Sequence, residues 1–395
     1  MNRKFWRWFV PLLVVACTSI ALVFVYGRQR HPLDAGPLLQ DVTTDAVTVV
    51  WWSSHSASSA LVLHRSDGSE QRLPTQRKGT RFEVRIAGLQ PSSSYDYRIE
   101  VGDEGTDKLQ VPGTLRTAPL PGESLSFLVF GDSGSGRRVQ YRLAQVMARH
   151  PADLILHTGD LVYRKGELRD YDRKFHRPYR ELLASIPFYP VLGNHDIHTD
   201  GGRPFLDTFS LPTNGPPTIE NERCYWFDYG DARFVAVDST LPEKDLAQSV
   251  APWVERVLLD SPLKWKIVFF HEPPWAGAYR PSNVKVRDIL VPSIEVGNAD
   301  VVFCGHNHLF ERTHLMRKGQ VSPADGVLYI ITGAGGKSLY KQTHGNDPHI
   351  AAYNNKKYSF TLVALHDDQL DISQIGENNR VLDTFTLTKS IDPQN

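Results

Sequence analysis

Five apolar segments after residue 120 of this 395-residue chain each end in side chains that can bind a metal. Continuous apolar runs bounded by polar turns are typical of strands buried on both faces. Folds that alternate strands and helices place their functional sites beyond the carboxyl ends of such strands. A single buried histidine is more often an ordinary core residue, but five equipped strand ends together predict one shared site. The residues at these ends are Asp132, Asp160, Asn194, His195, His271, His306 and His308.

The side chains at these strand ends offer oxygen and nitrogen atoms and no thiolate, since Cys304 lies within a strand segment. Such donors suit divalent and trivalent transition metals. A carboxylate such as that of Asp160 can bridge two cations, and two metals about 3.5–4 Å apart can clamp a phosphoryl group. The stretch GDSGSG, residues 131–136, could instead be a phosphate-cradling loop. This stretch lacks the Gly-Lys-Ser/Thr of a P-loop, which argues against nucleotide binding by that route. The sequence also has no G-x-S-x-G elbow after a strand, which argues against a serine hydrolase.

Two regions with different patterns divide the chain. Residues 33–117 contain short alternating apolar segments with turn clusters at intervals of about 8–12 residues, which predict an all-β sandwich. Within it, Leu89, Pro91 and Tyr95 have the arrangement of a tyrosine corner. A linker rich in proline and small residues follows, with a boundary near Pro119. Beyond it, strands alternate with helices, which predicts an α/β domain built on layered sheets.

Composition excludes some partners. Lys plus Arg and Asp plus Glu each number 44, so no overall charge attracts the chain to nucleic acid, and we expect no nucleic-acid-binding patch. Three cysteines in a chain of this length do not indicate a fold that depends on disulfide bonds.

The N-terminus predicts export from the cytoplasm. Arg3, Lys4 and Arg7 precede an uncharged apolar run from Trp8 to Tyr26, close to the roughly 20 residues of a membrane helix. We expect residues 1–31 to be an uncleaved membrane anchor with its N-terminus inside and the rest of the chain in the periplasm or at the cell surface. Lipidation at Cys17 and cleavage by signal peptidase, which would give a secreted protein, are the alternatives.

The motifs GDSG, GDLVY, GNHD, FFHEPP and GHNHLFER occur in this order, and together they resemble the calcineurin-like metallophosphoesterase superfamily and, more narrowly, the purple acid phosphatases. The segments GPLLQ, TVVWW and GLQPSSSYDYRI resemble pieces of a fibronectin-III-type N-terminal domain. The resemblance implies a four-layer α/β sandwich at residues 123–390, preceded by a fibronectin-III-like all-β domain at residues 33–118 and the membrane helix.

Two positions favour the narrower family. Most metallophosphoesterases have Asp-x-His at the first motif, whereas this sequence has Asp132, Ser133 and Gly134. Purple acid phosphatases also lack that histidine, and they carry a tyrosine three residues after the bridging aspartate, where this chain has Tyr163.

The resemblance also implies a ligand set for two metals. Asp132, Tyr163 and His308 would bind a ferric ion, and Asp160 would bridge it to a second ion. That second ion is divalent zinc, manganese or iron, because oxygen and nitrogen ligands do not choose sharply among them. Its other ligands would be Asn194, His271 and His306.

The implied activity is an acid phosphatase that hydrolyses monoesters of small phosphorylated substrates through a metal-bound hydroxide. His195 would bind phosphate or protonate the leaving group, and Asp196 would orient its ring. A phosphodiesterase acting on nucleotides or phospholipid head groups with the same metals is the alternative, and a non-catalytic surface protein is a third reading. The further substrate-contacting histidines of plant-type enzymes are absent. Candidates in their place are Glu272, Tyr279, Arg280, His198 and His314.

Overall fold

The computed structural model describes residues 33–56, 58–65, 67–102, 108–277, 281–340 and 347–389. The predicted membrane anchor, including Cys17, lies outside the described residues, as do Tyr279 and Arg280. Among the helices within these ranges, none combines the length and the apolar character that crossing a bilayer requires.

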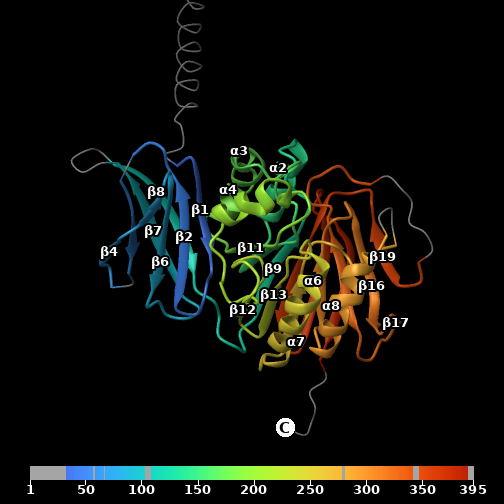
Figure 1. Cartoon of the computed structure of the whole chain (residues 1–395). Coiled ribbons are helices and arrows are strands. Elements are labelled where there is room, and N and C mark those ends of the chain that lie inside the picture. The colour runs from blue at the N-terminus through green and yellow to red at the C-terminus, as the bar shows by residue number, and fades with distance from the viewer. Residues whose placement is uncertain are drawn as a thin grey trace, which may run out of the picture.

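The N-terminal region forms two antiparallel four-stranded sheets, as the alternating pattern predicts (Figure 1). One sheet has the order β1 (Ala35–Gln40), β2 (Ala46–Trp52), β6 (Arg81–Ala87) and β5 (Gln76–Lys78). The other has the order β4 (Glu70–Leu73), β3 (Ser59–His64), β7 (Ser94–Val101) and β8 (Leu109–Arg116). The inward side chains alternate along the strands and include Trp51, which is fully buried and stacks on Phe82. The tyrosine corner is confirmed, because the Gln90 N–H donates to the Tyr95 hydroxyl at 2.8 Å.

The rest of the chain is built on two larger sheets. The six-stranded sheet has the order β11 (Phe188–Pro190), β10 (Leu154–His157), β9 (Leu125–Phe130), β20 (Ser359–His366), β21 (Gln369–Gly376) and β22 (Val381–Thr388). The eight-stranded sheet has the order β12 (Tyr225–Tyr229), β13 (Ala232–Ala236), β14 (Trp265–Phe269), β15 (Val301–Cys304), β18 (Val327–Thr332), β16 (Phe310–Arg317) and β17 (Gln320–Val321), with β19 (Ile350–Asn354) paired to β16. Strands β9, β10 and β11 are parallel, as are β13, β14, β15 and β18.

Helices accompany both sheets. Those between β9 and β11 are α2 (Arg138–Met147), α3 (Leu168–Tyr171), the π-helix η1 (Asp172–His176) and α4 (Arg177–Leu183). Short turns η2 (Asp196–His198) and η3 (Asp200–Gly202) lead to α5 (Arg203–Thr208). The second half contains α6 (Glu243–Asp245), η4 (Leu246–Val250), α7 (Ala251–Leu259) and α8 (Val284–Val296).

The layers follow from the alternation of side chains along the strands. On β9, Phe127 packs edge-on against Phe234 and Phe303 of the eight-stranded sheet. Phe130, on the opposite face of β9, packs against Tyr179 of α4. Apolar residues on the other face of the eight-stranded sheet pack with α7 and α8 in a separate core cluster. The two sheets therefore face each other, with helices outside both, and the α/β architecture is confirmed (Figure 1).

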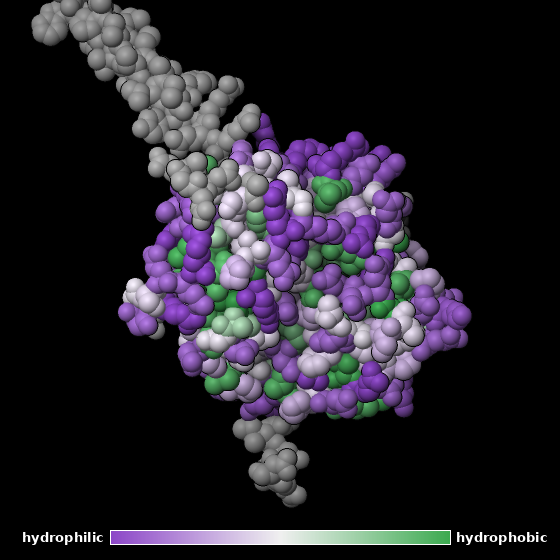
Figure 2. Space-filling view, turned by 60° about the vertical axis from the view of Figure 1, so that its left-hand side comes forward, coloured by the Kyte–Doolittle hydropathy of each residue, from purple (hydrophilic) through white to green (hydrophobic). Residues whose placement is uncertain are grey.

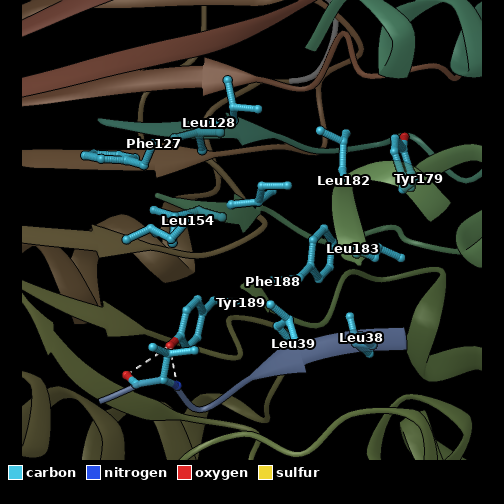
Figure 3. Packing of buried hydrophobic residues seen from close by; sticks show 14 of the residues in the cluster. Leu38, Leu39, Phe127, Leu128, Leu154, Tyr179, Leu182, Leu183, Phe188 and Tyr189 are labelled. Atoms are coloured by element: carbon cyan, nitrogen blue, oxygen red, sulfur yellow. Dashed lines mark hydrogen bonds between the residues drawn. The ribbon is translucent and has the colours of Figure 1, made fainter. Parts of the chain in front are cut away.

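The β region is packed onto the α/β region through buried contacts. Leu38 and Leu39 of β1 belong to the same apolar cluster as residues of α4, β9 and β11 (Figure 3). The Tyr189 hydroxyl accepts from the Val42 N–H at 2.9 Å across this contact. The predicted domain limits, 33–118 and 123–390, stay predictions.

The face in Figure 2 is mostly hydrophilic, with apolar residues in separate groups.

Candidate metal centre

The residues predicted to bind metals meet at one edge of the two facing sheets. They follow the carboxyl ends of β9, β10, β11, β14 and β15, all of which have parallel neighbours. Because parallel strands bring their carboxyl ends to the same edge, residues distant in the sequence become neighbours there. Contacts between side chains divide the seven predicted ligands into two groups that share Asp160.

The first group contains Asp132, Tyr163 and His308. The Tyr163 hydroxyl lies 2.9 Å from Asp132 Oδ1 and 3.0 Å from His308 Nε2. His308 Nε2 is 3.5 Å from Asp132 Oδ1. All three side chains are buried. This is the group that the resemblance assigns to the ferric ion.

The second group contains Asn194, His271 and His306. Asn194 Oδ1 lies 3.1 Å from His271 Nε2 and 2.9 Å from His306 Nδ1. The two imidazole nitrogens are 3.2 Å apart. This is the group that the resemblance assigns to the divalent ion.

Asp160 lies between the two groups. Its Oδ1 is 3.6 Å from His271 Nε2 in the second group. Ligand atoms of Asp160, Asp132 and His308 all lie within 4.8 Å of one another. Asp160 Oδ1 also accepts from the His195 N–H at 2.9 Å. One carboxylate is therefore near donors of both groups, as a bridging ligand must be.

The protons available in this cluster are too few for its acceptor atoms, which fits a site for cations. His271 Nδ1 donates to the Thr158 carbonyl at 2.8 Å, so in the neutral ring Nε2 presents a lone pair to Asn194 Oδ1 and Asp160. His308 Nδ1 likewise donates to the Ser338 carbonyl at 2.9 Å, so its Nε2 presents a lone pair to the first group. Acceptors that face acceptors in a buried site are costly without a cation among them.

The Tyr163 hydroxyl has a single proton for two acceptors. Burial, Asp132 and Asp160 raise the pKa of Tyr163 well above its usual value of 10. A phenolate at this position therefore requires a cation beside it, and the donor set supplies the hard ligands that a ferric ion favours.

Backbone conformation gives independent evidence of a functional site. Asp132, Asp160 and His306 adopt positive φ angles of 55°, 57° and 68°, in the left-handed region that residues with side chains rarely occupy. Such conformations cost free energy and tend to gather at functional sites, where the surrounding structure holds them. Three of the seven predicted ligands share this feature.

Two glycines bring the ligand-bearing turns together. A Cβ atom at Gly193 would lie 2.3 Å from Asp160 Oδ1, so this glycine lets the turn after β11 approach the bridging carboxylate. A Cβ atom at Gly134 would lie 1.7 Å from the Leu161 carbonyl oxygen. The backbone therefore leaves no room for the histidine that most metallophosphoesterases carry at that position.

His195 lies at the rim of the two groups. Its ring centroid is 4.6 Å from that of Tyr163, and Nδ1 donates to the Arg164 carbonyl at 2.6 Å. Because Nδ1 makes the bond to the Arg164 carbonyl, Nε2 is the ring nitrogen that can contact another group. The side chain is partly exposed. The position is consistent with a contact to substrate, which stays a prediction.

The predicted role of Asp196 in orienting the His195 ring is wrong. Asp196 is fully buried, and its carboxylate accepts from the backbone N–H groups of Leu161, Val162 and Gly193 at 3.0–3.2 Å. The Arg164 carbonyl makes the bond to the ring instead. Burial and Asp160 raise the pKa of Asp196 to about 7. Asp196 thus ties the turn after β10 to the turn after β11, which positions ligands from both.

Three of the other candidates for substrate contact lie within the described residues, and Glu272 among them interacts electrostatically with His271 and Asp160. His198 is exposed, with its ring 5.5 Å from that of His195. His314 is exposed on β16, and Glu272 is mostly buried, with a carboxylate oxygen that has no hydrogen-bond partner within the described residues.

Sequence reasoning missed three residues that support the centre. His157 is buried and links Ser133 to Gly159, with Nε2 2.8 Å from the Ser133 hydroxyl, and burial lowers its pKa to about 3. Lys174 of η1 contacts the Tyr163 carbonyl and pairs with Asp170 at 2.6 Å. Lys337 lies over the Tyr163 ring. Of these three residues, only Lys337 stands in a sequence pattern that could have pointed to the site, because it follows a glycine-rich turn after a buried strand.

Comparisons with known proteins agree with this geometry. Residues 125–310 match the family described as Calcineurin-like phosphoesterase. The chain is 24% identical to Purple acid phosphatase 15 of Arabidopsis thaliana over 361 residues, which cover 82% of this chain and 66% of that protein. It is 24% identical over 352 residues to a Nucleotide pyrophosphatase/phosphodiesterase of Hordeum vulgare, with coverage of 73% and 90%. The structure of a purple acid phosphatase from yellow lupin seeds superposes with a TM-score of 0.79 at 18% identity, covering 89% of this chain and 74% of that one.

Residues 125–310 match the calcineurin-like phosphoesterase family, and the chain shares the fold of a purple acid phosphatase. In sequence the chain is similar to purple acid phosphatases.

Proposed function

We propose that the chain is a dimetal phosphoesterase that hydrolyses phosphate monoesters, with a ferric ion and a divalent zinc, manganese or iron ion. The observation that carries this proposal is the convergence of Asp132, Tyr163 and His308 on one side of Asp160, and of Asn194, His271 and His306 on the other. The names of the relatives support the same activity.

When bound, the two cations supply positive charge to the phosphoryl oxygens and activate water for attack on phosphorus. The chain itself positions the groups that complete the site. His195 lies beside Tyr163 with its Nδ1 held by the Arg164 carbonyl, so Nε2 is the atom that would contact a phosphoryl oxygen or donate a proton to the leaving group. The bonds from His271 and His308 to backbone carbonyls fix the orientation of both rings before metals bind.

A diesterase is the second candidate, because the barley relative is named a nucleotide pyrophosphatase/phosphodiesterase and spans most of this chain. The same ligand set would serve either reaction. Specificity would then depend on the side chains around the metals and not on the metals themselves.

Steady-state hydrolysis by the full chain, loaded with iron and zinc, separates the candidates. A higher kcat/KM for 4-nitrophenyl phosphate than for bis(4-nitrophenyl) phosphate supports the monoesterase. The opposite preference refutes it in favour of the diesterase. Absence of hydrolysis of both esters by fully metal-loaded protein refutes the enzymatic function.

We also propose that residues 1–31 anchor the chain in a membrane with the catalytic region outside the cytoplasm. The basic residues before the apolar run and the length of that run support this topology. Protease protection tests this topology. A catalytic region at the cell surface is digested in intact cells, and a periplasmic one is digested once the outer barrier is permeabilised while the cytoplasmic membrane stays intact. Resistance until the cytoplasmic membrane is lysed would contradict the topology.

The N-terminal β region is proposed to be of the fibronectin-III type, on the strength of its two antiparallel sheets and its tyrosine corner.

A further inference from the structure

A pocket of about 1060 Å³ lies where the N-terminal β region meets the α/β region, and none of the predicted metal ligands is among the residues that line it. Strands β2, β5 and β6 border it on one side and α3, η1 and α4 on the other, and Figure 1 shows α4 beside β1. Small-molecule sites favour such junctions and occupy roughly 300–1,000 Å³. We call this space the junction pocket, and its wall includes Trp52, Arg81, Tyr171, Asp172, His176 and Arg180.

Several wall residues of the junction pocket carry buried polar atoms that lack partners. Within the described residues, no hydrogen bond reaches the Tyr171 hydroxyl, Asp172 Oδ1, His176 Nδ1 or Arg81 Nε. Tyr171 and His176 are only 2% and 5% exposed. A buried polar atom without a partner destabilises a fold. Four such atoms around one pocket therefore indicate an occupant that supplies the missing partners.

The unpartnered atoms include both donors and acceptors. Arg81 Nε donates, Asp172 Oδ1 accepts, and the Tyr171 hydroxyl can do both. Burial lowers the pKa of His176 to about 3, so its ring is neutral at neutral pH and Nδ1 is either a donor or an acceptor. Hydroxyl groups match this mixed set, because each of them both donates and accepts.

Arg180 of α4 adds a cation without an ion pair to the wall of the junction pocket. Arg177 pairs with Asp172 at 2.6 Å and Lys78 pairs with Asp207 at 3.2 Å, whereas within the described residues the Arg180 side chain makes no ion pair or hydrogen bond. Burial lowers the pKa of Arg180 below 12.5 and outweighs the opposite effect of Asp172. An anion beside Arg180 would stabilise its charge, and a guanidinium can bind a carboxylate through two parallel hydrogen bonds.

Trp52 gives the junction pocket an apolar surface. Its side chain is partly exposed at the end of β2, and its ring centroid lies 4.8 Å from that of His176. The C–H groups of a sugar ring can be buried against such a surface while the hydroxyls at the edge of the ring make hydrogen bonds.

We propose that the junction pocket binds a small carboxylated sugar, with the carboxylate at Arg180, the hydroxyls at the unpartnered polar atoms and the C–H surface against Trp52. One unpaired arginine matches a single negative charge. The carboxylates of Asp34, Asp172 and Asp207 in the same wall disfavour the double charge of a phosphate group. This inference does not depend on the proposed phosphoesterase function.

Isothermal titration calorimetry of the metal-loaded full chain tests the proposal with D-glucuronate and D-galacturonate, and with D-glucose, D-galactose and acetate as controls. We expect at least one uronate to bind about tenfold or more tightly than the neutral sugars and acetate, which each carry only part of its groups. Binding of neither uronate would leave water as the occupant and overturn the proposal. Inorganic phosphate that binds more tightly than the uronates, and in a way that depends on Arg180, would also overturn it.

Arg180→Met locates the binding, and Arg149→Met is its matched control because Arg149 is an exposed arginine in the turn after α2. Arg180→Met should lower the affinity for the uronate by about 10- to 100-fold, and Arg149→Met should leave it unchanged. Uronate binding that Arg180→Met does not weaken would lie elsewhere, the metal centre included, and would overturn the proposal.

Tyr171→Phe is the milder variant, because it removes a hydroxyl that has no partner in the fold. Its melting temperature without sugar should not fall, and its affinity for the uronate should fall by about 3- to 10-fold. Unchanged affinity in Tyr171→Phe would contradict the placement of the sugar hydroxyls at this wall.

Discussion

The Tyr163 N–H donates to the Gly134 carbonyl at 3.0 Å. This bond links the predicted tyrosine ligand to the position at which most metallophosphoesterases have a histidine ligand and this chain has a glycine. The space where a Gly134 side chain would start is filled by the Leu161 carbonyl oxygen, two residues before Tyr163. The loss of a histidine at the first motif and the presence of a tyrosine after the second are therefore parts of one packing arrangement. The segment that delivers Tyr163 occupies the space that the histidine would need.

Substitution of Gly134 by alanine is expected to damage this arrangement. An added Cβ atom 1.7 Å from a carbonyl oxygen requires the backbone after β9 or after β10 to move, which should cost about 3 kcal/mol or more of stability. Thermal unfolding and metal content of Gly134→Ala report both effects. Gly376→Ala is the control, because the atom nearest its added Cβ would be the side-chain oxygen of Asn378 at 3.0 Å, and the nearest backbone atom, the Arg380 carbonyl oxygen, would lie at an ordinary contact distance of 3.5 Å. Equal melting temperatures for the two variants would contradict the proposed coupling.

Substitution of Tyr163 by phenylalanine tests the identity of the ligand in the first group. If Tyr163 binds a ferric ion as phenolate, the iron-loaded wild type should absorb in the visible region and Tyr163→Phe should lose that band. Tyr340→Phe is expected to keep the band, because the Tyr340 ring stacks on His308 and its hydroxyl donates to the backbone carbonyl of His306 at 3.2 Å. A band that survives in iron-loaded Tyr163→Phe would rule out the assignment.

Substitution of Asp160 by asparagine should weaken both metal sites at once, because Asp160 is close to donors of both groups. We expect affinity for each metal to fall by more than the roughly 10- to 100-fold that follows loss of a residue supporting a ligand. Metal analysis after dialysis against graded chelator measures this. Asp132→Asn is the comparison, and it should reduce mainly the iron content. Retention of one metal at full occupancy in Asp160→Asn would argue against a bridge.

The strand ends were predictable because an apolar run that stops at a polar residue is a local pattern, and the fold brings parallel strand ends together regardless of detail. Contacts that depend on tertiary packing were not. Adjacency in GNHD suggested that Asp196 supports His195, yet the ring bonds to Arg164 from another turn. The stacking of Lys337 on Tyr163 joins segments far apart in the chain. Strands β21 and β22 were not expected, since polar residues interrupt their apolar pattern.

Asp196 and His195 should separate in their effects on stability and activity. Asp196→Asn replaces an acceptor of three backbone N–H groups by an amide with one acceptor oxygen, so it should cost about 1–3 kcal/mol of stability. His195→Asn should leave the melting temperature near that of the wild type and lower kcat. Chemical denaturation and 4-nitrophenyl phosphate hydrolysis measure the two effects. Loss of activity without loss of stability in Asp196→Asn would restore a catalytic role for Asp196.

Glu222 should make the stability of the fold depend on pH away from the metal centre. Burial raises the pKa of Glu222 from 4.5 to about 7 in the folded chain. Between these values folded Glu222 binds more protons than unfolded Glu222, so the contribution of Glu222 to the free energy of unfolding is fully present below pH 4.5 and is lost as the pH rises through about 7. Glu222→Gln keeps a neutral side chain that can still accept from the Leu211 N–H. The variant should therefore match the wild type near pH 5 and melt at a higher temperature near pH 8.

Glu243→Gln supplies the matched control for the Glu222 measurement, because Glu243 is exposed on α6. Its substitution removes the same charge without relieving burial, so its melting temperature should differ from the wild type by the same small amount at both pH values. If Glu222→Gln behaved in the same way, the buried carboxylate would not be a source of pH-dependent stability. If Glu222→Gln were less stable near pH 8, the charged form of Glu222 would stabilise the fold, opposite to the effect that burial predicts.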